Sequence, residues 1–130
     1  MDSKKKIFII DDDSFLLDMY ALKFNQSNFI VTTALGSEQA LEKLRLDSAF
    51  DIILLDIMMP VMDGFELMEK MKEENLAQGS IKIILSNRGQ PSDIARGESL
   101  GASGYIVKAS STPTEVIEKV NVIISSITKK

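Results

Sequence analysis

The sequence predicts an α/β domain with a doubly wound parallel sheet, in which five strands alternate with five helices. Two observations predict this fold. Short apolar runs recur five times along the 130 residues, and amphipathic helical patterns fill the intervals between them. Most of the runs are dense in Ile, Leu and Val, which is typical of strands buried on both faces of a parallel sheet. Regular alternation of strand and helix favours right-handed crossovers, with helices on both faces of one sheet.

The expected strands are the five apolar runs: Ile7–Ile10, Phe29–Thr33, Ile52–Leu55, Ile81–Leu85 and Tyr105–Val107. The second run contains two threonines and is more polar than the others. We therefore expect it at an edge of the sheet, where one side of the strand is less completely covered.

Three helices are predicted by apolar stripes at helical spacing. The stripes are Phe15, Leu16, Met19 and Leu22; then Ala40, Leu41 and Leu44; then Leu67, Met68 and Met71. A fourth helix near Ser92–Leu100 is weaker, because Gly97 in its interior costs about 1 kcal/mol relative to alanine. Leu100-Gly101 is typical of a helix end.

The last helix has the clearest pattern. Thr112-Pro113-Thr114-Glu115 is typical of a capping box with proline at the first helical position. One continuous apolar face follows, made of Val116, Ile117, Val120, Ile123, Ile124 and Ile127.

Composition limits the function. The length of 130 residues fits one domain, and the absence of cysteine excludes disulfides and thiolate chemistry. The absence of histidine removes the usual ligands of a transition metal, so a bound metal must have oxygen ligands. The net charge of −4 gives no support for nucleic-acid binding, and no apolar stretch is long enough for a membrane span. We expect a cytoplasmic protein.

Polar residues follow four of the five predicted strands. Asp11, Asp12 and Asp13 follow the first, Asp56 the third, Ser86 the fourth and Lys108 the fifth, whereas Ala34-Leu35-Gly36 follows the second. In a doubly wound sheet the ligand site lies beyond the carboxyl ends of the strands, where the strand order reverses. A site that omits the second strand fits the strand order 2-1-3-4-5.

The residues at this edge are suited to phosphoryl transfer. Two carboxylates ~4 Å apart repel by about 4 kcal/mol at an effective dielectric constant near 20, so they stay together only if a cation or protons offset this repulsion. Oxygen ligands alone select a hard divalent ion such as Mg²⁺. Lys108 adds a positive charge and Ser86 a hydroxyl donor, and phosphoryl transfer requires mainly positioning and neutralisation of charge. A carboxylate that attacks phosphorus gives an aspartyl phosphate.

Four segments together resemble the marker segments of the response-regulator receiver family. They are Ile9–Asp13, Leu55–Gly64, Ile84–Ser86 and Gly104–Lys108. Each segment is unspecific when taken alone, but the set has the right order and spacing over nearly the whole chain. The resemblance implies one receiver domain over residues 1–130 with a flavodoxin-like (βα)5 fold, similar to single-domain chemotaxis regulators.

The resemblance also implies a role for each matching residue. Asp56 would be the phosphoacceptor. Asp11 and Asp12 would position Mg²⁺ with the backbone carbonyl of Met58, and Asp12 would be the more direct ligand. Ser86 would be the switch hydroxyl, Tyr105 the aromatic side chain that changes rotamer, and Lys108 the partner of the phosphoryl group. Pro60 and Gly64 would shape the loop beside Asp56.

Some of these residues also have a purely structural interpretation. Helix capping fits Asp13 or Ser14 better than Asp11 and Asp12, although three consecutive aspartates leave the metal ligands uncertain by one residue. Asp63, with Glu66 three residues later, is typical of a capping box for the third helix. Met59 and Met62 are interpreted as packing residues.

Two residues depart from the family pattern. The family lysine is usually followed by proline in a cis peptide, but Ala109 follows Lys108 here. Because a cis bond before a non-proline residue costs ~3 kcal/mol, the loop is expected to be either trans or strained. The residue after the switch hydroxyl is usually small but is Asn87 here. It would either contact a phosphoryl oxygen or narrow the access to Asp56.

The resemblance implies a phosphorylation-controlled signalling switch, not an enzyme acting on an external substrate. A histidine kinase or histidine phosphotransfer protein would supply the phosphoryl group. The response would pass through the fourth helix, fifth strand and fifth helix to an output protein, an effector domain or a second copy of the chain.

Three other functions fit parts of the pattern. The first is a Mg²⁺-dependent phosphohydrolase with an aspartyl nucleophile, although such enzymes commonly have a second Asp where this chain has Met58. The second is a receiver-like binding module that is never phosphorylated. The third is a nucleotide or flavin domain, but no glycine-rich phosphate loop follows the first strand.

Overall fold

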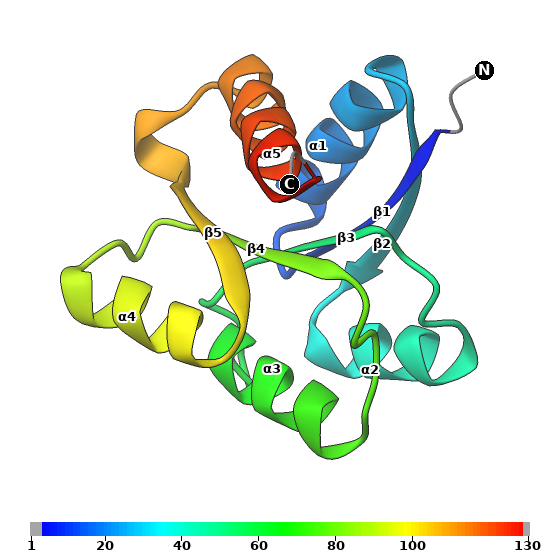
Figure 1. The fold of residues 1–130 in the computed structure, drawn as a ribbon, viewed down its shortest axis with the longest axis vertical. Coiled ribbons are helices and arrows are strands. Elements are labelled where there is room, and N and C mark those ends of the chain that lie inside the picture. The colour runs from blue at the N-terminus through cyan, green and yellow to red at the C-terminus, as the bar shows by residue number, and fades with distance from the viewer. Residues whose placement is uncertain (1–3, 129–130) are drawn as a thin grey trace.

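The computed structural model describes residues 4–128, which form a five-stranded parallel sheet in the order β2-β1-β3-β4-β5. Both the α/β class and the strand order predicted from the sequence are confirmed (Figure 1). The strands are β1 (Lys5–Asp11), β2 (Phe29–Leu35), β3 (Ile52–Leu55), β4 (Ile81–Ser86) and β5 (Ala102–Val107). The helices are α1 (Ser14–Gln26), α2 (Ser37–Leu46), α3 (Gly64–Glu73), α4 (Pro91–Ser99) and α5 (Pro113–Thr128), with a 3₁₀ turn at Lys108–Ser110.

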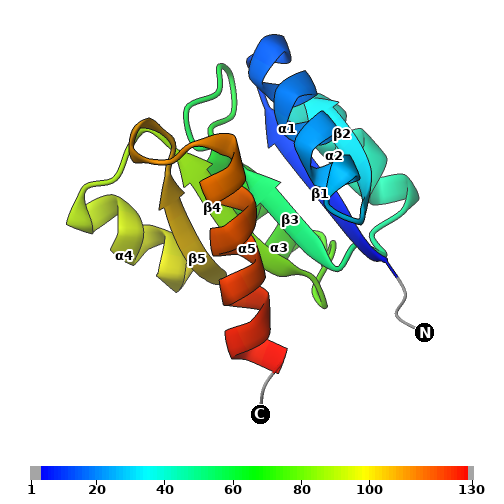
Figure 2. The same ribbon diagram turned by 90° about the horizontal axis from the view of Figure 1, so that it is seen from above.

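The helices form two layers around the sheet. α1 and α5 cover one face, and α2, α3 and α4 lie on the other (Figures 1 and 2). Side chains alternate between these faces along each central strand: Ile7 and Ile9 pack under α1 and α5, whereas Phe8 and Ile10 pack toward α2 and α3. Because both faces are covered, the central strands are continuous apolar runs and not alternating ones.

The predicted helix starts are confirmed. The Asp13 carboxylate accepts a hydrogen bond from the Leu16 amide and caps α1. At α3, Asp63 and Glu66 form a reciprocal capping box. Thr112 and Glu115 form the same arrangement before α5. These caps satisfy backbone donors that a helix start leaves unpaired. The cap at Asp13 fixes the chain just after β1, and the cap at Asp63 fixes the end of the loop that follows β3.

The predicted core stripe of α1 is wrong. Phe15 and Leu22 are 76% and 57% exposed, and Leu16 and Met19 are only partly buried. The buried face instead consists of Leu17, Tyr20 and Phe24. Apolar residues occur on most sides of this helix, so helical periodicity alone does not determine which side faces the sheet.

α4 lies close to the sheet through a glycine. It begins at Pro91 and ends at Ser99, followed by Gly101 in the left-handed conformation with φ of 104°, as the predicted stop requires. A Cβ atom on Gly97 would lie 2.6 Å from Cδ1 of Ile84. Gly97 is therefore explained by close packing and not only by a weak helix.

Four of the observed strands, β1, β2, β4 and β5, are longer than the predicted runs. β2 continues to Leu35 and occupies an edge of the sheet, as its polar character indicated. β5 begins at Ala102, three residues before the predicted run, because Ala102 and Gly104 pair with Lys82 and Ile83 of β4 without being strongly apolar, and the register shifts between these two pairs. No helix among residues 4–128 has the length and apolar character to cross a membrane.

Candidate phosphoacceptor site

The predicted site residues gather at the carboxyl edge of the sheet. Asp11 is the last residue of β1, Asp56 follows β3, Ser86 ends β4 and Lys108 follows β5. β1, β3, β4 and β5 are neighbours in the sheet, and β2 lies outside them at one edge. The sheet order thus brings together residues that are as far as 97 positions apart in the sequence.

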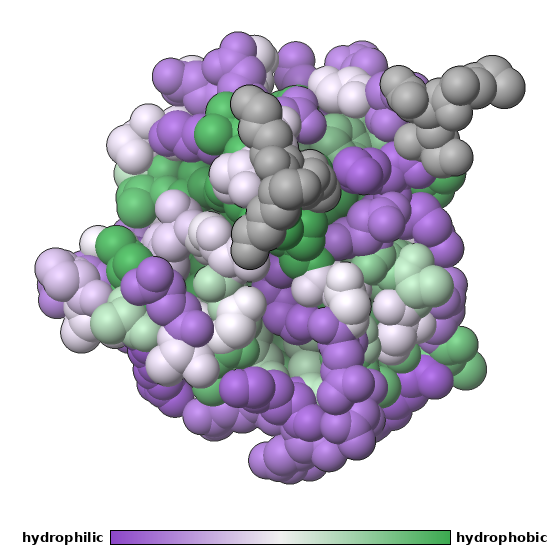
Figure 3. All heavy atoms as spheres, viewed as in Figure 1, coloured by the Kyte–Doolittle hydropathy of each residue, from purple (hydrophilic) through white to green (hydrophobic). Residues whose placement is uncertain are grey.

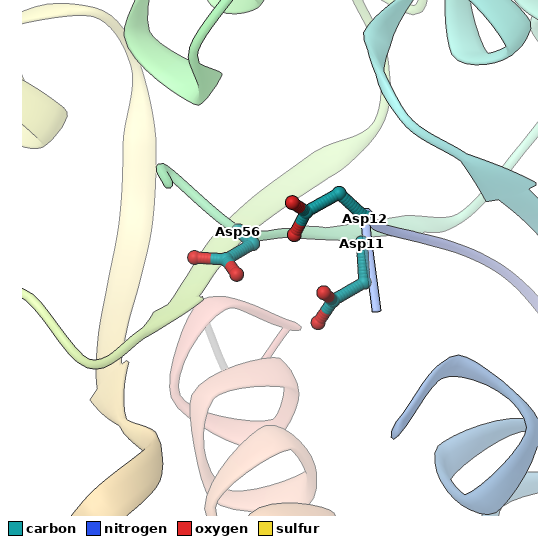
Figure 4. A group of neighbouring side chains, drawn as sticks. All are labelled: Asp11, Asp12 and Asp56. Atoms are coloured by element: carbon teal, nitrogen blue, oxygen red, sulfur yellow. The ribbon is translucent and has the colours of Figure 1, made fainter. Parts of the chain in front are cut away.

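Three carboxylates converge at this edge. Asp11, Asp12 and Asp56 each have an oxygen atom within 4.8 Å of the others (Figure 4). Asp11 and Asp56 are buried, whereas Asp12 is exposed. Burial raises the pKa of Asp11 above its usual value, although Lys108 and the Asp13 amide act in the opposite direction. Burial therefore disfavours a negative charge on Asp11, and a positively charged partner offsets this cost.

Lys108 bridges the two buried carboxylates. Its Nζ atom donates to Oδ2 of Asp11 at 2.7 Å and to Oδ2 of Asp56 at 2.8 Å. Burial lowers the pKa of Lys108, but the two hydrogen bonds and the two negative charges together outweigh it and raise the pKa above its usual value. Lys108 is thus a cation, and a phosphoryl group on Asp56 would lie beside it.

The alanine after Lys108 does not divert the lysine from the site. The Lys108–Ala109 peptide is trans, and residues 108–110 form a single 3₁₀ turn. Of the two alternatives that the sequence left open, the trans loop is the one found.

The segment after β3 fixes the position of Asp56. The Asp56 amide donates to the Ile10 carbonyl at 3.1 Å, and the Met58 amide donates to Oδ1 of Asp56 at 3.1 Å. Gly64 at the start of α3 lies against this backbone, where a Cβ atom would be 2.2 Å from the Asp56 carbonyl oxygen. Only glycine fits there. Between Asp56 and Gly64 the chain makes a tight γ-turn centred on Val61, which adopts a φ of 71°. The Met62 amide donates to the Pro60 carbonyl across this turn.

Ser86 and Tyr105 both contact the loop between β4 and α4. The Ser86 hydroxyl is fully buried and accepts a hydrogen bond from the Arg88 amide at 3.3 Å. The Tyr105 hydroxyl donates to the Arg88 carbonyl. Asn87 lies between Ser86 and Arg88 and is exposed, so its effect on access to Asp56 stays a prediction.

The residues present fit a hard divalent cation. The donors are carboxylate oxygens, two of the three acids are held in place by burial, and the exposed Asp12 keeps the cluster open to water and ligands. Mg²⁺ typically binds one or two protein carboxylates and keeps waters or phosphate oxygens as its other ligands.

Two features of the site were not predicted from the sequence. One is the bond from Lys108 to Asp11, because the order of strands does not show that one ammonium group reaches both acids. The other is Arg88, whose backbone contacts both Ser86 and Tyr105. No pattern in the sequence singles out Arg88, since an arginine after a strand is ordinary in an exposed loop.

A doubly wound sheet with three acids, a lysine and a hydroxyl at its carboxyl edge defines a class of phosphoacceptor signalling domains. Comparison with known proteins agrees. The model of the response regulator receiver domain family matches residues 7–121. The chain belongs to this family, whose members are signalling phosphoacceptors of two-component systems.

Individual relatives support the same conclusion. The chain is 31% identical over 120 residues to the alkaline phosphatase synthesis transcriptional regulatory protein PhoP of Bacillus subtilis, covering 92% of this chain and 48% of PhoP. It is similar in structure to the chemotaxis response regulator CheY4 of Vibrio cholerae (TM-score 0.82, 25% identity, 92% of this chain and 98% of that chain). It is also similar to the BeF3-activated DrrB receiver domain (TM-score 0.78, 26% identity, 94% and 98%).

The chain spans about half the length of the first curated relatives that it matches, since it covers 48% and 49% of two of them. Family membership therefore concerns the receiver domain, and it implies switching controlled by phosphorylation.

Proposed function

We propose that residues 1–130 form one receiver domain in which Asp56 accepts a phosphoryl group from a phosphohistidine of a histidine kinase or histidine phosphotransfer protein. The observation that carries this proposal is the position of the Asp56 carboxylate, which lies within 4.8 Å of two further acids and 2.8 Å from Lys108. In the transfer, a carboxylate oxygen of Asp56 bonds to phosphorus, the bond from phosphorus to the imidazole nitrogen breaks, and the imidazole leaves with the electron pair.

Asp11, Asp12 and Asp56 would hold Mg²⁺, together with the backbone carbonyl of Met58. When bound, the ion would neutralise charge on the transferred group. Lys108 supplies a further positive charge beside Asp56, and the Met58 amide orients the Asp56 carboxylate by its bond to Oδ1. Gly64 keeps the backbone of Asp56 close to the start of α3. The chain thus supplies positioning and charge, which are the main requirements of phosphoryl transfer.

The added phosphoryl charge would change the bonds around the site. Lys108 would move part of its interaction from Asp11 and Asp56 to a phosphoryl oxygen, and Ser86 would turn its hydroxyl toward the same group. Because Ser86 and Tyr105 both bond to Arg88, a shift at Ser86 would alter the environment of Tyr105. The surface of α4, β5 and α5 would then bind an output protein, an effector domain or a second copy of the chain.

The acceptor is tested by incubating the protein with a small phosphodonor and Mg²⁺ and measuring the intact mass. Wild type should gain one phosphoryl group, and Asp56→Asn should gain none. Asp63→Asn is a matched control, because asparagine caps a helix about as well as aspartate and Asp63 lies seven residues away on the next helix start. Equal labelling of wild type and Asp56→Asn would reject Asp56 as the acceptor.

The same experiment separates the rival functions. A phosphohydrolase would release phosphate from small esters over many turnovers, whereas the proposed switch should take up one phosphoryl group per chain. A binding module that is never phosphorylated would gain no mass from small phosphodonors or from a phosphohistidine protein. The lysine bridge to Asp56 favours the switch over the binding module, since a phosphoryl group on Asp56 would gain this cation as a partner.

A further inference from the structure

The segment between β2 and α2 bonds to two of the chain segments that carry the clustered acids. Its Gly36 amide donates to the Asp11 carbonyl at 2.9 Å. The Ser37 hydroxyl donates to the Met62 carbonyl at 2.6 Å and lies 3.8 Å from Sδ of Met59. None of the three acids comes from β2, but the residues that follow this strand contact the end of β1 and the loop between β3 and α3.

Ser37 is held in place at the start of α2. It is the first residue of the helix and is buried. Gly36 before it has a φ of 87° and a ψ of 171°, a conformation essentially restricted to glycine. The helix packs Ala40, Leu41 and Leu44 into the core, whereas the surface at the bottom of Figure 3, over α3 and part of α2, is mostly hydrophilic. The close-packed side of α2 therefore gives the Ser37 hydroxyl a rigid base.

The loop that Ser37 contacts contains two tight turns. The Met59 amide donates to the carbonyl two residues earlier at 3.0 Å, which makes a turn centred on Met58, and the γ-turn centred on Val61 follows. A positive φ is costly for a β-branched residue and persists only where the surroundings hold it. The side chains of Met58 and Val61 are 53% and 90% exposed, so they contribute little to holding the loop. The bond from Ser37 to Met62 fixes the end of the second turn.

We propose that Ser37 is a positioning residue for the metal site, because it holds the loop in which the backbone carbonyl of Met58 is presented to a divalent cation. This inference rests on the proposed function, which assigns that carbonyl to the metal site. Without the hydroxyl, the Met62 carbonyl loses its partner in a partly buried place, and the turn at Val61 relaxes. The Met58 carbonyl then has to be ordered when the cation binds, and the cost of this ordering weakens the affinity.

The test measures the affinity for Mg²⁺ by NMR, from the shifts of backbone amides during titration. Ser37→Ala removes one oxygen atom and adds no bulk, so the variant should fold. Its affinity should fall by about three- to fivefold, because fewer molecules hold the loop in the arrangement that binds. Labelling by a small phosphodonor should need about three- to fivefold more Mg²⁺ for its half-maximal rate. The rate at saturating Mg²⁺ should stay within about twofold of wild type.

Ser80→Ala is the matched control. The Ser80 hydroxyl also donates to a distant backbone carbonyl at 2.6 Å, that of Phe50, but Ser80 precedes β4 at the amino edge of the sheet, opposite the site. Both variants should lose a similar part of the free energy of unfolding in urea, and only Ser37→Ala should weaken Mg²⁺ binding. In the metal-free protein, solvent exchange of the Met59 and Met62 amides should rise about threefold or more in Ser37→Ala and stay unchanged in Ser80→Ala.

Different results reject different parts of the proposal. Equal Mg²⁺ affinity in wild type and Ser37→Ala, or an equal loss of affinity in Ser80→Ala, would overturn the positioning role. A labelling rate of Ser37→Ala that stays far below wild type at saturating Mg²⁺ would also contradict it, since the loop would then affect more than the metal. A wild-type protein whose amides do not respond to Mg²⁺ and that gains no phosphoryl group would instead reject the proposed function itself.

Discussion

α4 and α5 both lie beside β5, but they are held to the molecule in different ways. α5 buries four branched apolar side chains, Val116, Ile117, Val120 and Ile124. α4 buries an acid and a glycine, and Arg96 on its outer part lies 4.6 Å from the Phe65 ring centroid and 3.6 Å from Glu69. A close-packed apolar face has one good arrangement, whereas polar contacts at a surface can be exchanged for water at low cost. The comparison indicates that α5 is held to the sheet more firmly than α4.

The largest effect on stability is expected at Gly64, where the start of α3 lies directly against the backbone of Asp56 and Ile57. In Gly64→Ala the new Cβ atom would lie 2.2 Å from the Asp56 carbonyl and 2.8 Å from Cα of Ile57. We expect a loss of about 3 kcal/mol in the free energy of unfolding, measured by urea denaturation.

Gly97→Ala is the matched substitution on α4. Its new Cβ atom would meet the tip of the Ile84 side chain at 2.6 Å, which can rotate away. The better helix propensity of alanine offsets about 1 kcal/mol of this strain, so the free energy of unfolding should change by less than ~1 kcal/mol. Equal losses in Gly64→Ala and Gly97→Ala would contradict the view that α4 adapts to a new contact more easily than the start of α3 does.

Truncation of apolar side chains should affect α5 more than α4. Val120 is fully buried, so Val120→Ala should lower the free energy of unfolding by about 2 kcal/mol. Ile94 on α4 is 37% exposed, and Ile94→Ala should cost less than ~1 kcal/mol. Val122→Ala serves as the control on α5 itself, because Val122 is 66% exposed and its truncation should be nearly neutral. A larger loss from Ile94→Ala than from Val120→Ala would reverse the comparison.

Amide hydrogen exchange tests the same difference in the native state. Amides of α4 should open at least about tenfold more often than those of α5, since local stability follows the buried apolar contacts of each element. Arg88→Met removes the ion pair of Arg88 with Asp93 in the first turn of α4, at 2.8 Å, so it should increase exchange in α4 and leave α5 unchanged. Uniform protection across both helices would mean that α4 is as firmly held as α5.

Titration of the two tyrosines gives the smallest expected effect. Burial and the negative charge of Asp93 raise the pKa of Tyr105, on the side of α4, above 10.0. The unfolded chain therefore loses this proton first, and stability should fall as the pH rises above 10.0. Tyr105→Phe should show a shallower fall.

The absorbance of phenolate measures the titration directly. Tyr105→Phe leaves Tyr20 as the one remaining tyrosine, and burial raises the pKa of Tyr20 as well. Asp93→Asn should lower the midpoint assigned to Tyr105 without moving that of Tyr20. A Tyr105 midpoint at or below 10.0 in wild type would contradict the contacts described for its hydroxyl.

Much of the fold could be predicted because few arrangements of strands and helices are compatible with the pattern of apolar runs. The central strands are buried on both faces, so they appear as unbroken runs, and the caps at Asp13, Asp63 and Thr112 use local hydrogen bonds that sequence spacing determines. The face of α1 could not be predicted, since its orientation depends on which side chains fit against β1 and α5. The start of β5 was missed because its pairing with β4 does not depend on apolar residues.

The residues that gather at the site could be predicted from the order of the strands, but the contacts made by the loops could not. Strand order brings Asp11, Asp56 and Lys108 to one edge, and that order follows from topology. The contacts of Arg88 depend on the path of a loop and on the position of α4, neither of which has a periodic signal in the sequence. Roles that depend on loop geometry therefore become visible only in three dimensions.

The three consecutive aspartates at the end of β1 lie in three different environments. Asp11 is buried and bonds to Lys108, Asp12 is exposed within the acidic cluster, and Asp13 caps α1. The chain leaves β1 at Asp11 and enters α1 at Ser14, so a shift of one position would move each aspartate into the environment of its neighbour. The insertion or deletion of one aspartate here would keep the segment acidic. It would nevertheless leave either α1 without its cap or Lys108 without its acid. The spacing of these three residues, and not only their type, therefore determines whether the site and the helix cap can form together.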